Sequence, residues 1–161
     1  MSETTNKVIK KIGDITTVIN PVAMIPVAYF LCGWKGLVIY ASTYGLSALI
    51  SQILKGIFDA PRPRDSQQEH VLYIHKYSHK DGESFLSQHA MSACAPAAFA
   101  LFFVSPWWIF IPFFIVAVIC SWTRVYVKAH WPLDVIAACL LTFNCCLLAA
   151  YLLKVVWPCL H

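Results

Sequence analysis

The sequence contains very little charge. Asp, Glu, Lys and Arg make up 12% of its 161 residues, and the formal net charge is +4. Soluble domains carry about a quarter charged residues, so this composition excludes a water-exposed globular domain. A disordered chain is excluded too, because 59% of the residues are hydrophobic and the mean hydropathy is +0.64. At this length we expect a single domain over residues 1–161.

Four long stretches have no charged residue at all. They are residues 15–34, 36–54, 90–123 and 135–153. About 20 apolar residues in a helix are enough to cross the hydrocarbon core of a bilayer. The third stretch is too long for one crossing, and Ser105-Pro106 near its middle favours a break. The sequence therefore predicts an all-α, polytopic membrane bundle of about five transmembrane helices. The predicted spans are 12–33, 35–57, 88–105, 107–126 and 132–157.

The connection between the second and third spans is rich in charge. Half of the charged residues fall between Lys55 and Glu83, so residues 58–87 are expected to form a charged interfacial loop. Trp and Tyr favour membrane–water interfaces, and their positions support the span count. Five spans place Trp34, Trp107, Trp108 and Trp157 at one interface, and Trp122, Tyr126 and Trp131 at the other, beside the charged loop.

Cysteine and histidine patterns do not favour a metal centre. Most of the seven cysteines lie inside predicted spans, where small side chains suit helix packing, and their odd number argues against a disulfide framework. His70, His75 and His79 in the charged loop could be considered as metal ligands, but no cysteine accompanies them. We favour a solvated loop, and we expect neither a metal nor another cofactor.

Several ionisable and polar residues lie at the ends of the predicted membrane spans, where such residues are uncommon. Because successive spans run in opposite directions, these residues are predicted to meet at one membrane face. They are Lys55, Arg62, Ser87, Gln88, His89, Arg124, His130 and Asp134. Ionisable groups at such positions are candidates for function. Three cations, two histidines, a hydroxyl and one carboxylate predict a site that binds an anion.

The residue types favour a phosphate as that anion. Arginine and lysine side chains bind phosphoryl oxygens, and a helix that begins near Ser87 would add its N-terminal N–H groups. His130 and Asp134 are spaced i, i+4, so they share one helix face. A carboxylate beside a histidine leaves the other ring nitrogen free to act as a nucleophile or a base. With His89 as a second proton carrier, the set suits phosphoryl transfer through a covalent intermediate.

Three motifs, within residues 55–63, 87–89 and 123–134, resemble a known signature. Lys55-x6-Arg62-Pro63, Ser87-x-His89 and Arg124-x5-His130-x3-Asp134 are similar to the three-part signature of the type 2 phosphatidic acid phosphatase superfamily. The resemblance implies a metal-independent membrane lipid phosphatase of bacterial type. It implies that His130 attacks phosphorus, Asp134 orients His130, and His89 protonates the leaving oxygen. The phosphate-binding residues that it implies are Lys55, Arg62, Ser87, Gln88 and Arg124. The substrates that it implies are phosphatidic acid, phosphatidylglycerol phosphate, polyprenyl diphosphates or lipid A.

The sequence departs from that signature at three positions. Leu86 stands where proline is usual, Gln88 where glycine is usual, and Thr123 where serine is usual. Gln88 keeps its backbone N–H but adds a side chain where the phosphate should approach, which bears on rate or substrate geometry. Two alternatives stay open: a weakened family member that binds a lipid phosphate without turnover, and a small transporter or channel subunit.

Two arguments about membrane orientation disagree. Ten of the twelve Lys and Arg residues precede the first span or lie on the face of the anion site, which by the positive-inside rule would be cytoplasmic. The resemblance implies the opposite, since bacterial relatives generally place this site outside. We expect an integral protein of the bacterial inner membrane whose site faces outward. Its expected partners are a lipid phosphate and membrane lipids, not nucleic acid.

Overall fold

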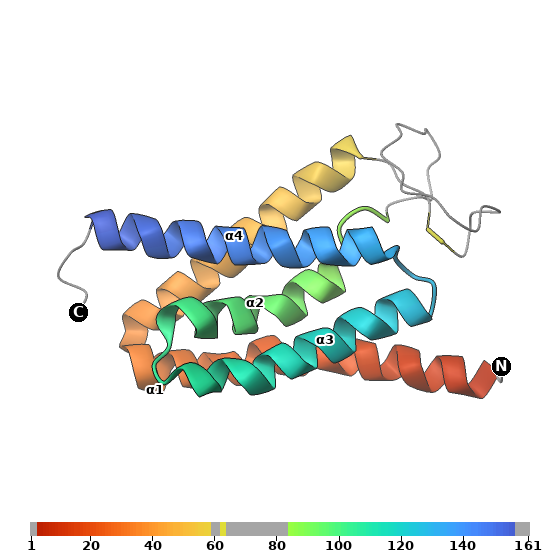
Figure 1. Cartoon of the computed structure of the whole chain (residues 1–161), viewed down its shortest axis with the longest axis horizontal. Helices are drawn as coiled ribbons and strands as arrows, with labels where there is room; N and C mark the ends of the chain where they lie inside the picture. The colour runs from red at the N-terminus through yellow and green to blue at the C-terminus, as the bar shows by residue number, and fades with distance from the viewer. Residues whose placement is uncertain (1–2, 59–61, 64–83, 157–161) are drawn as a thin grey trace.

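The computed structural model describes residues 3–58, 62–63 and 84–156, and all regular secondary structure within them is helical (Figure 1). In chain order the helices are α1 (Glu3–Ile57), α2 (Gln88–Phe103), the 3-10 turn η1 (Trp107–Ile109), α3 (Phe110–Tyr126) and α4 (Pro132–Val156). The prediction of an all-α fold is confirmed. Most of the charged loop, including His70, His75 and His79, lies outside the described residues.

The helix α1 is kinked at one glycine and doubles back on itself. Gly33 has φ 66° and ψ −165°, a left-handed backbone that a side chain would strain. In Figure 1 a first arm runs from the N-terminus to the far end of the bundle, and a second arm returns. These arms are the predicted spans 12–33 and 35–57, so the break falls where the sequence indicated. Likewise, α2 ends before Ser105-Pro106 and η1 begins just after it.

The helix α2 lies in the middle of the bundle (Figure 1). Every residue from Ala90 to Ala100 is buried, and α2 contacts α1, α3 and α4. Its many alanines let the neighbouring helices approach closely. With 16 residues, α2 rises only about 24 Å, less than the roughly 30 Å of a bilayer core. Its sides are covered by α1, α3 and α4.

Three described helices are long and apolar enough to cross a membrane: Thr4–Ile57, Trp107–Tyr126 and Pro132–Leu153. The first has 54 residues, enough for two crossings, one for each arm. Large apolar side chains such as Val18, Ile115 and Leu140 stay exposed on the outer surface, as lipid-facing residues do. The chain is an integral membrane protein.

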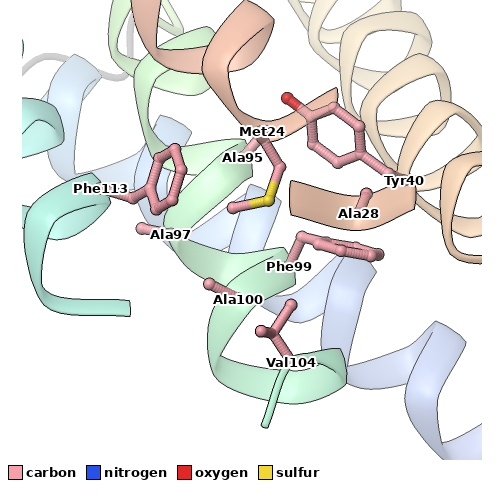
Figure 2. Close-up of a cluster of buried hydrophobic side chains, with 9 residues drawn as sticks. All are labelled: Met24, Ala28, Tyr40, Ala95, Ala97, Phe99, Ala100, Val104 and Phe113. Carbon is pink, nitrogen blue, oxygen red and sulfur yellow. The ribbon is translucent and has the colours of Figure 1, made fainter. Parts of the chain in front are cut away.

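An apolar cluster fixes the two arms of α1 against α2 and α3 (Figure 2). The rings of Tyr40 and Phe99 meet edge to face, with centroids 5.2 Å apart. Asn20 is a buried polar residue beside this cluster. Its side-chain amide donates hydrogen bonds to the carbonyl oxygens of Ala93 at 2.7 Å and Phe113 at 3.2 Å. This one side chain therefore joins α1 to both α2 and α3 inside the membrane.

The two ends of the bundle differ in character. The kink of α1 and η1 lie at one end, where Trp34, Trp107 and Trp108 are exposed. At the other end lie the N-terminus, the end of the second arm, the starts of α2 and α4, and the end of α3 (Figure 1). Trp122 is exposed near that second end. The separation follows the predicted interfaces, except that Trp157 lies outside the described residues.

Candidate active site

A cavity of about 730 Å³ lies at the end of the bundle where the predicted polar residues meet. It is lined by residues from both arms of α1, the start of α2, the end of α3 and the connection between α3 and α4. Six of the eight sequence-predicted residues line it: Lys55, Arg62, Gln88, His89, Arg124 and His130. The other two, Ser87 and Asp134, are buried. The structure thus brings together residues from all three motifs.

Ser87 is the N-cap of α2. Its Oγ accepts a hydrogen bond from the N–H of Ala90 at 3.3 Å, and its own N–H donates to the carbonyl oxygen of Asp134 at 3.3 Å. The preceding residue, Leu86, is buried and has φ 58°, an uncommon left-handed conformation for a non-glycine residue. The resemblance implied that Ser87 binds phosphate. In this structure its hydroxyl oxygen caps the helix whose first residues, Gln88 and His89, line the cavity.

A tight turn after α3 places His130 beside Arg124. Lys128 has φ 53°, and the N–H groups of Ala129 and His130 both donate to the carbonyl oxygen of Arg124, at 3.0 and 3.3 Å. This local reversal brings the histidine of the third motif back to the last turn of α3. Both side chains consequently line the same cavity.

The His130 ring is oriented by a backbone carbonyl. Its Nδ1 lies 2.9 Å from the carbonyl oxygen of Ser84 and 3.8 Å from Oδ2 of Asp134. Since a carbonyl oxygen can only accept, Nδ1 carries the proton, and in the neutral ring Nε2 has the lone pair. The Asp134 carboxylate accepts hydrogen bonds from the Ser84 hydroxyl and, at 3.0 Å, from the N–H of Trp131. Ser84, which the sequence did not single out, thus connects the two residues.

Three buried donor groups around the cavity are unpaired. Arg62 Nε, Gln88 Nε2 and Arg124 Nε are buried and have no hydrogen-bond partner among the residues that the structure describes. Buried N–H groups are nearly always paired in folded proteins, and leaving one unpaired costs about 1–3 kcal/mol. All three residues line the same cavity. The cavity is therefore bordered by two arginine side chains and one amide side chain, which are groups that bind the oxygens of an anionic ligand.

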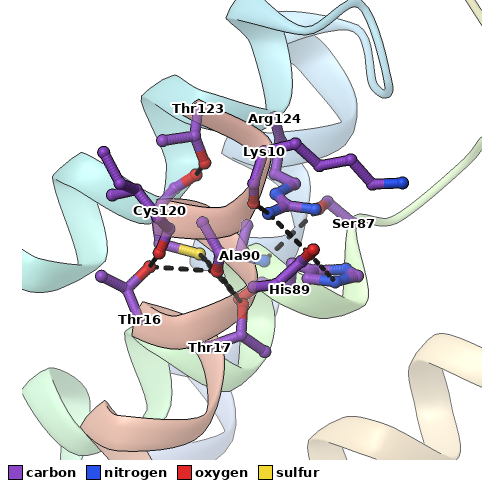
Figure 3. A network of polar contacts seen from close by, with 12 residues as sticks. Lys10, Thr16, Thr17, Ser87, His89, Ala90, Cys120, Thr123 and Arg124 are labelled. Carbon is purple, nitrogen blue, oxygen red and sulfur yellow. Dashed lines mark hydrogen bonds and ion pairs between the residues drawn. The ribbon is translucent and has the colours of Figure 1, made fainter. Parts of the chain in front are cut away.

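The first arm of α1 holds Arg124 in place (Figure 3). The guanidinium is only 4% exposed, and its Nη2 donates to the carbonyl oxygen of Lys10 at 3.1 Å. The same nitrogen forms an ion pair with Oδ1 of Asp14 at 3.0 Å, and this oxygen lies 3.5 Å from His89 Nε2. A Cβ atom added at Gly13 would overlap the guanidinium of Arg124 and the hydroxyl of Thr123. Gly13 therefore permits the close approach of α1 to α3.

Lys10, Gly13 and Asp14 are site residues that the motifs did not indicate. They are spaced i, i+3, i+4, which places them on one helix face. One sequence signal could have found Asp14, since it is a carboxylate inside the predicted span 12–33. Ionisable residues in membrane spans usually serve function.

Comparison with known families and structures agrees with this geometry. A family model described as the PAP2 superfamily matches residues 36–157. The chain belongs to this superfamily. The family that the motifs resemble is thereby confirmed. The PAP2 match begins after the kink of α1, so the first arm, with Lys10, Gly13 and Asp14, lies outside it.

Two known proteins are similar to this chain. An undecaprenyl-diphosphatase of Sulfolobus acidocaldarius is 48% identical over 58 residues, which are 36% of this chain and 28% of that protein. The crystal structure of a transmembrane PAP2-type phosphatidylglycerolphosphate phosphatase from Bacillus subtilis superposes with a TM-score of 0.67. It has 21% sequence identity, and the superposition covers 97% of this chain and 80% of that one. The two chains share a transmembrane fold that includes the first arm of α1.

Proposed function

We propose that this protein is a membrane lipid phosphatase that hydrolyses a phosphate monoester or diphosphate of an amphiphilic lipid. One observation carries the proposal: the side chains of Lys55, Arg62, Gln88 and Arg124 line the same cavity as His130. Phosphoryl oxygens accept several hydrogen bonds and carry the charge that arginine binds. The cavity lies at an end of the bundle, where a lipid headgroup would meet it while the lipid tails stay in the bilayer.

In the first step, His130 is the nucleophile. The lone pair on Nε2 attacks phosphorus, and an N–P bond forms as the P–O bond to the lipid breaks. The carbonyl oxygen of Ser84 keeps the Nδ1 proton in place, and the Asp134 carboxylate, 3.8 Å away, stabilises the positive charge that develops on the ring. The leaving oxygen takes a proton from the imidazolium of His89, so the lipid departs as a neutral alcohol.

In the second step, the phosphohistidine is hydrolysed. Water attacks phosphorus, and the now neutral His89 takes a proton from that water as the N–P bond breaks. Inorganic phosphate leaves, His130 returns to its neutral form, and His89 is protonated again. Lys55, Arg62 and Arg124 are fixed cations around the cavity that neutralise the phosphoryl oxygens in both steps. Because they supply this charge, we propose that the reaction needs no divalent metal.

Gln88 contributes a donor in this proposal. Its amide Nε2 is one of the unpaired groups, and its side chain lines the cavity beside His89. The amide can donate to a phosphoryl oxygen where the signature has only a glycine N–H. This donor would strengthen phosphate binding, which the catalytic proposal and the binding-only alternative both require. The transporter alternative was motivated by the polar residues at one membrane face. A phosphate-binding site accounts for these residues without a transport path.

Phosphate release from purified protein in detergent tests the proposal. The panel comprises phosphatidic acid, phosphatidylglycerol phosphate and a polyprenyl diphosphate, each assayed with and without millimolar EDTA. The proposal would be supported if the protein releases phosphate from at least one of these lipids, if EDTA does not stop this release, and if His130→Ala abolishes it. Binding of a lipid phosphate without release would indicate the binding-only alternative. Activity that EDTA removes and zinc or magnesium restores would contradict the metal-free reaction.

A further inference from the structure

Asp14 places a carboxylate in a cavity that is otherwise rich in cations. Its Oδ1 lies 3.0 Å from Nη2 of Arg124 and 3.5 Å from Nε2 of His89. A carboxylate near an anion-binding site repels the ligand, so its presence weakens phosphate binding unless it serves another step. Asp14 also lies on the first arm of α1, outside the residues matched by the PAP2 family model.

Each of the two histidines in the site has its own carboxylate. His130 lies 3.8 Å from Asp134, and the side chains of this pair are only 7% and 5% exposed. His89 lies 3.5 Å from Asp14, and the side chains of this pair are 40% and 47% exposed. The first pair is buried against Ser84 and Trp131, whereas the second is open to the cavity. The two histidine–carboxylate pairs therefore lie in different environments, one buried and one open to the cavity.

Donation of a proton by His89 requires that the ring be protonated before the reaction. A neutral imidazole that gave up its single N–H would leave a strongly basic anion. The cavity that His89 lines also holds the cations Arg124 and Lys55, which disfavour a further positive charge on the ring. Asp14, whose Oδ1 lies 3.5 Å from His89 Nε2, is a carboxylate that favours the protonated ring. Its charge offsets the cations where the ring meets the cavity.

We propose that Asp14 is a positioning residue that keeps His89 protonated and directed at the leaving oxygen. The inference rests on the proposed function, since proton donation belongs to that reaction. Asp14 itself transfers no proton: the proton passes from His89 to the lipid oxygen, and a proton from water later restores His89. Arg124 does not depend on Asp14 alone, because its Nη2 also donates to the carbonyl oxygen of Lys10 at 3.1 Å. Loss of the carboxylate should therefore act mainly through His89.

The test compares two leaving groups in the full-length Asp14→Asn protein. A lipid monophosphate releases an alkoxide, which must be protonated, whereas p-nitrophenyl phosphate releases a phenolate that leaves without a proton. General acid catalysis contributes roughly 10²–10⁴-fold, so we expect kcat on the lipid to fall by about 10-fold or more. The kcat on p-nitrophenyl phosphate should change by less than about 3-fold, because the departure of the phenolate needs no acid.

Three further variants complete the design. His89→Asn should lose activity on both substrates, because His89 is also the base of the shared second step, and the loss should be greater on the lipid. Lys11→Gln changes a charge on an exposed residue of the same helix that does not line the cavity, and should match the wild type on both substrates. His130→Ala should be inactive on both. If the wild type released no phosphate, or if His130→Ala stayed active, the proposed function itself would fail, whatever Asp14→Asn showed.

Three results for Asp14→Asn would overturn the inference while leaving the proposed function intact. Equal losses on both substrates would show that Asp14 acts through Arg124 or the fold. A lower KM with an unchanged or higher kcat would show that the carboxylate only competes with phosphate for Arg124. Wild-type rates on both substrates would show that it has no part in the reaction.

Discussion

The carboxylate of Asp14 lies 3.0 Å from the guanidinium of Arg124, although one belongs to the first arm of α1 and the other to the last turn of α3. This ion pair joins the N-terminal helix to the third motif of the PAP2 signature. The site is consequently larger than the signature, and its wall includes a segment that the family match does not reach.

Substitution of Gly13 by alanine should disrupt the site. The added Cβ would overlap the guanidinium of Arg124 and the hydroxyl of Thr123, so either α1 or the arginine must move. Charge-assisted hydrogen bonds contribute about 1.5–3 kcal/mol, so displacing Arg124 should lower kcat/KM by about 10-fold to 100-fold. Gly45→Ala is the matched control, because a Cβ at Gly45 meets nothing within 4 Å. Equal activities of the two alanine variants would refute this packing argument.

Substitution of Gln88 by methionine should weaken substrate binding. Methionine keeps the length of the side chain but removes the buried Nε2 donor, which has no partner among the described residues. Loss of one hydrogen bond to a charged phosphoryl group, about 1.5 kcal/mol or more, should raise KM by about 10-fold. The value of kcat should change less, because the nucleophile is untouched. A KM at or below that of the wild type would show that the glutamine obstructs the phosphate.

Substitution of Asn20 by leucine should lower stability without changing the chemistry of the site. The buried amide joins α1 to the carbonyl oxygens of Ala93 and Phe113. Hydrogen bonds between membrane helices contribute about 0.6 kcal/mol on average and up to about 1.7. The melting temperature in detergent should therefore fall by a few degrees. Asn144→Leu is the control, since Asn144 is exposed and donates to Leu140 of its own helix. An equal fall in both variants would argue against the interhelical role.

The site should face away from the cytoplasm. In a background without native cysteines, Lys11→Cys reports the end of the bundle that holds the cavity, and Ser105→Cys reports the opposite end; both positions are exposed. A membrane-impermeant maleimide applied to intact cells should label Lys11→Cys and not Ser105→Cys. The reverse pattern would show that the excess of Lys and Arg, rather than the family analogy, determines orientation.

Much of the fold could be predicted from the sequence, because membrane helices follow from apolar length. The charge-free runs gave the two arms of α1, η1 with α3, and α4, and Ser105-Pro106 marked a real break. The central position of α2 in the bundle was harder to predict from the sequence. Its burial from Ala90 to Ala100 depends on which helices surround it, and composition alone does not determine that.

The candidate site was only partly predictable for a similar reason. The three motifs contain residues whose chemistry is visible in their types and spacing, and the structure brings their cavity-lining members together. The role of Ser84 could not be predicted, because it orients His130 through its backbone carbonyl oxygen, which any residue could supply. Gly13 escaped because its role is to carry no side chain where α1 meets α3. Such contributions arise from tertiary packing and leave no sequence pattern.

The central claim is that His130 attacks phosphorus, and detection of the covalent intermediate tests it most directly. Wild-type protein and the variants His130→Ala and His89→Asn are mixed with a lipid substrate that carries radioactive phosphate, and are then denatured in alkali, in which phosphohistidine is stable. We predict acid-labile label on the wild type and none on His130→Ala. His89→Asn should form little label from the lipid, but it should accumulate label from a substrate with a good leaving group, because it forms the intermediate without an acid and hydrolyses it slowly. Peptide mass spectrometry should place the phosphate on His130. Acid-labile label on the His130→Ala protein, or phosphate mapped to another residue, would contradict the account.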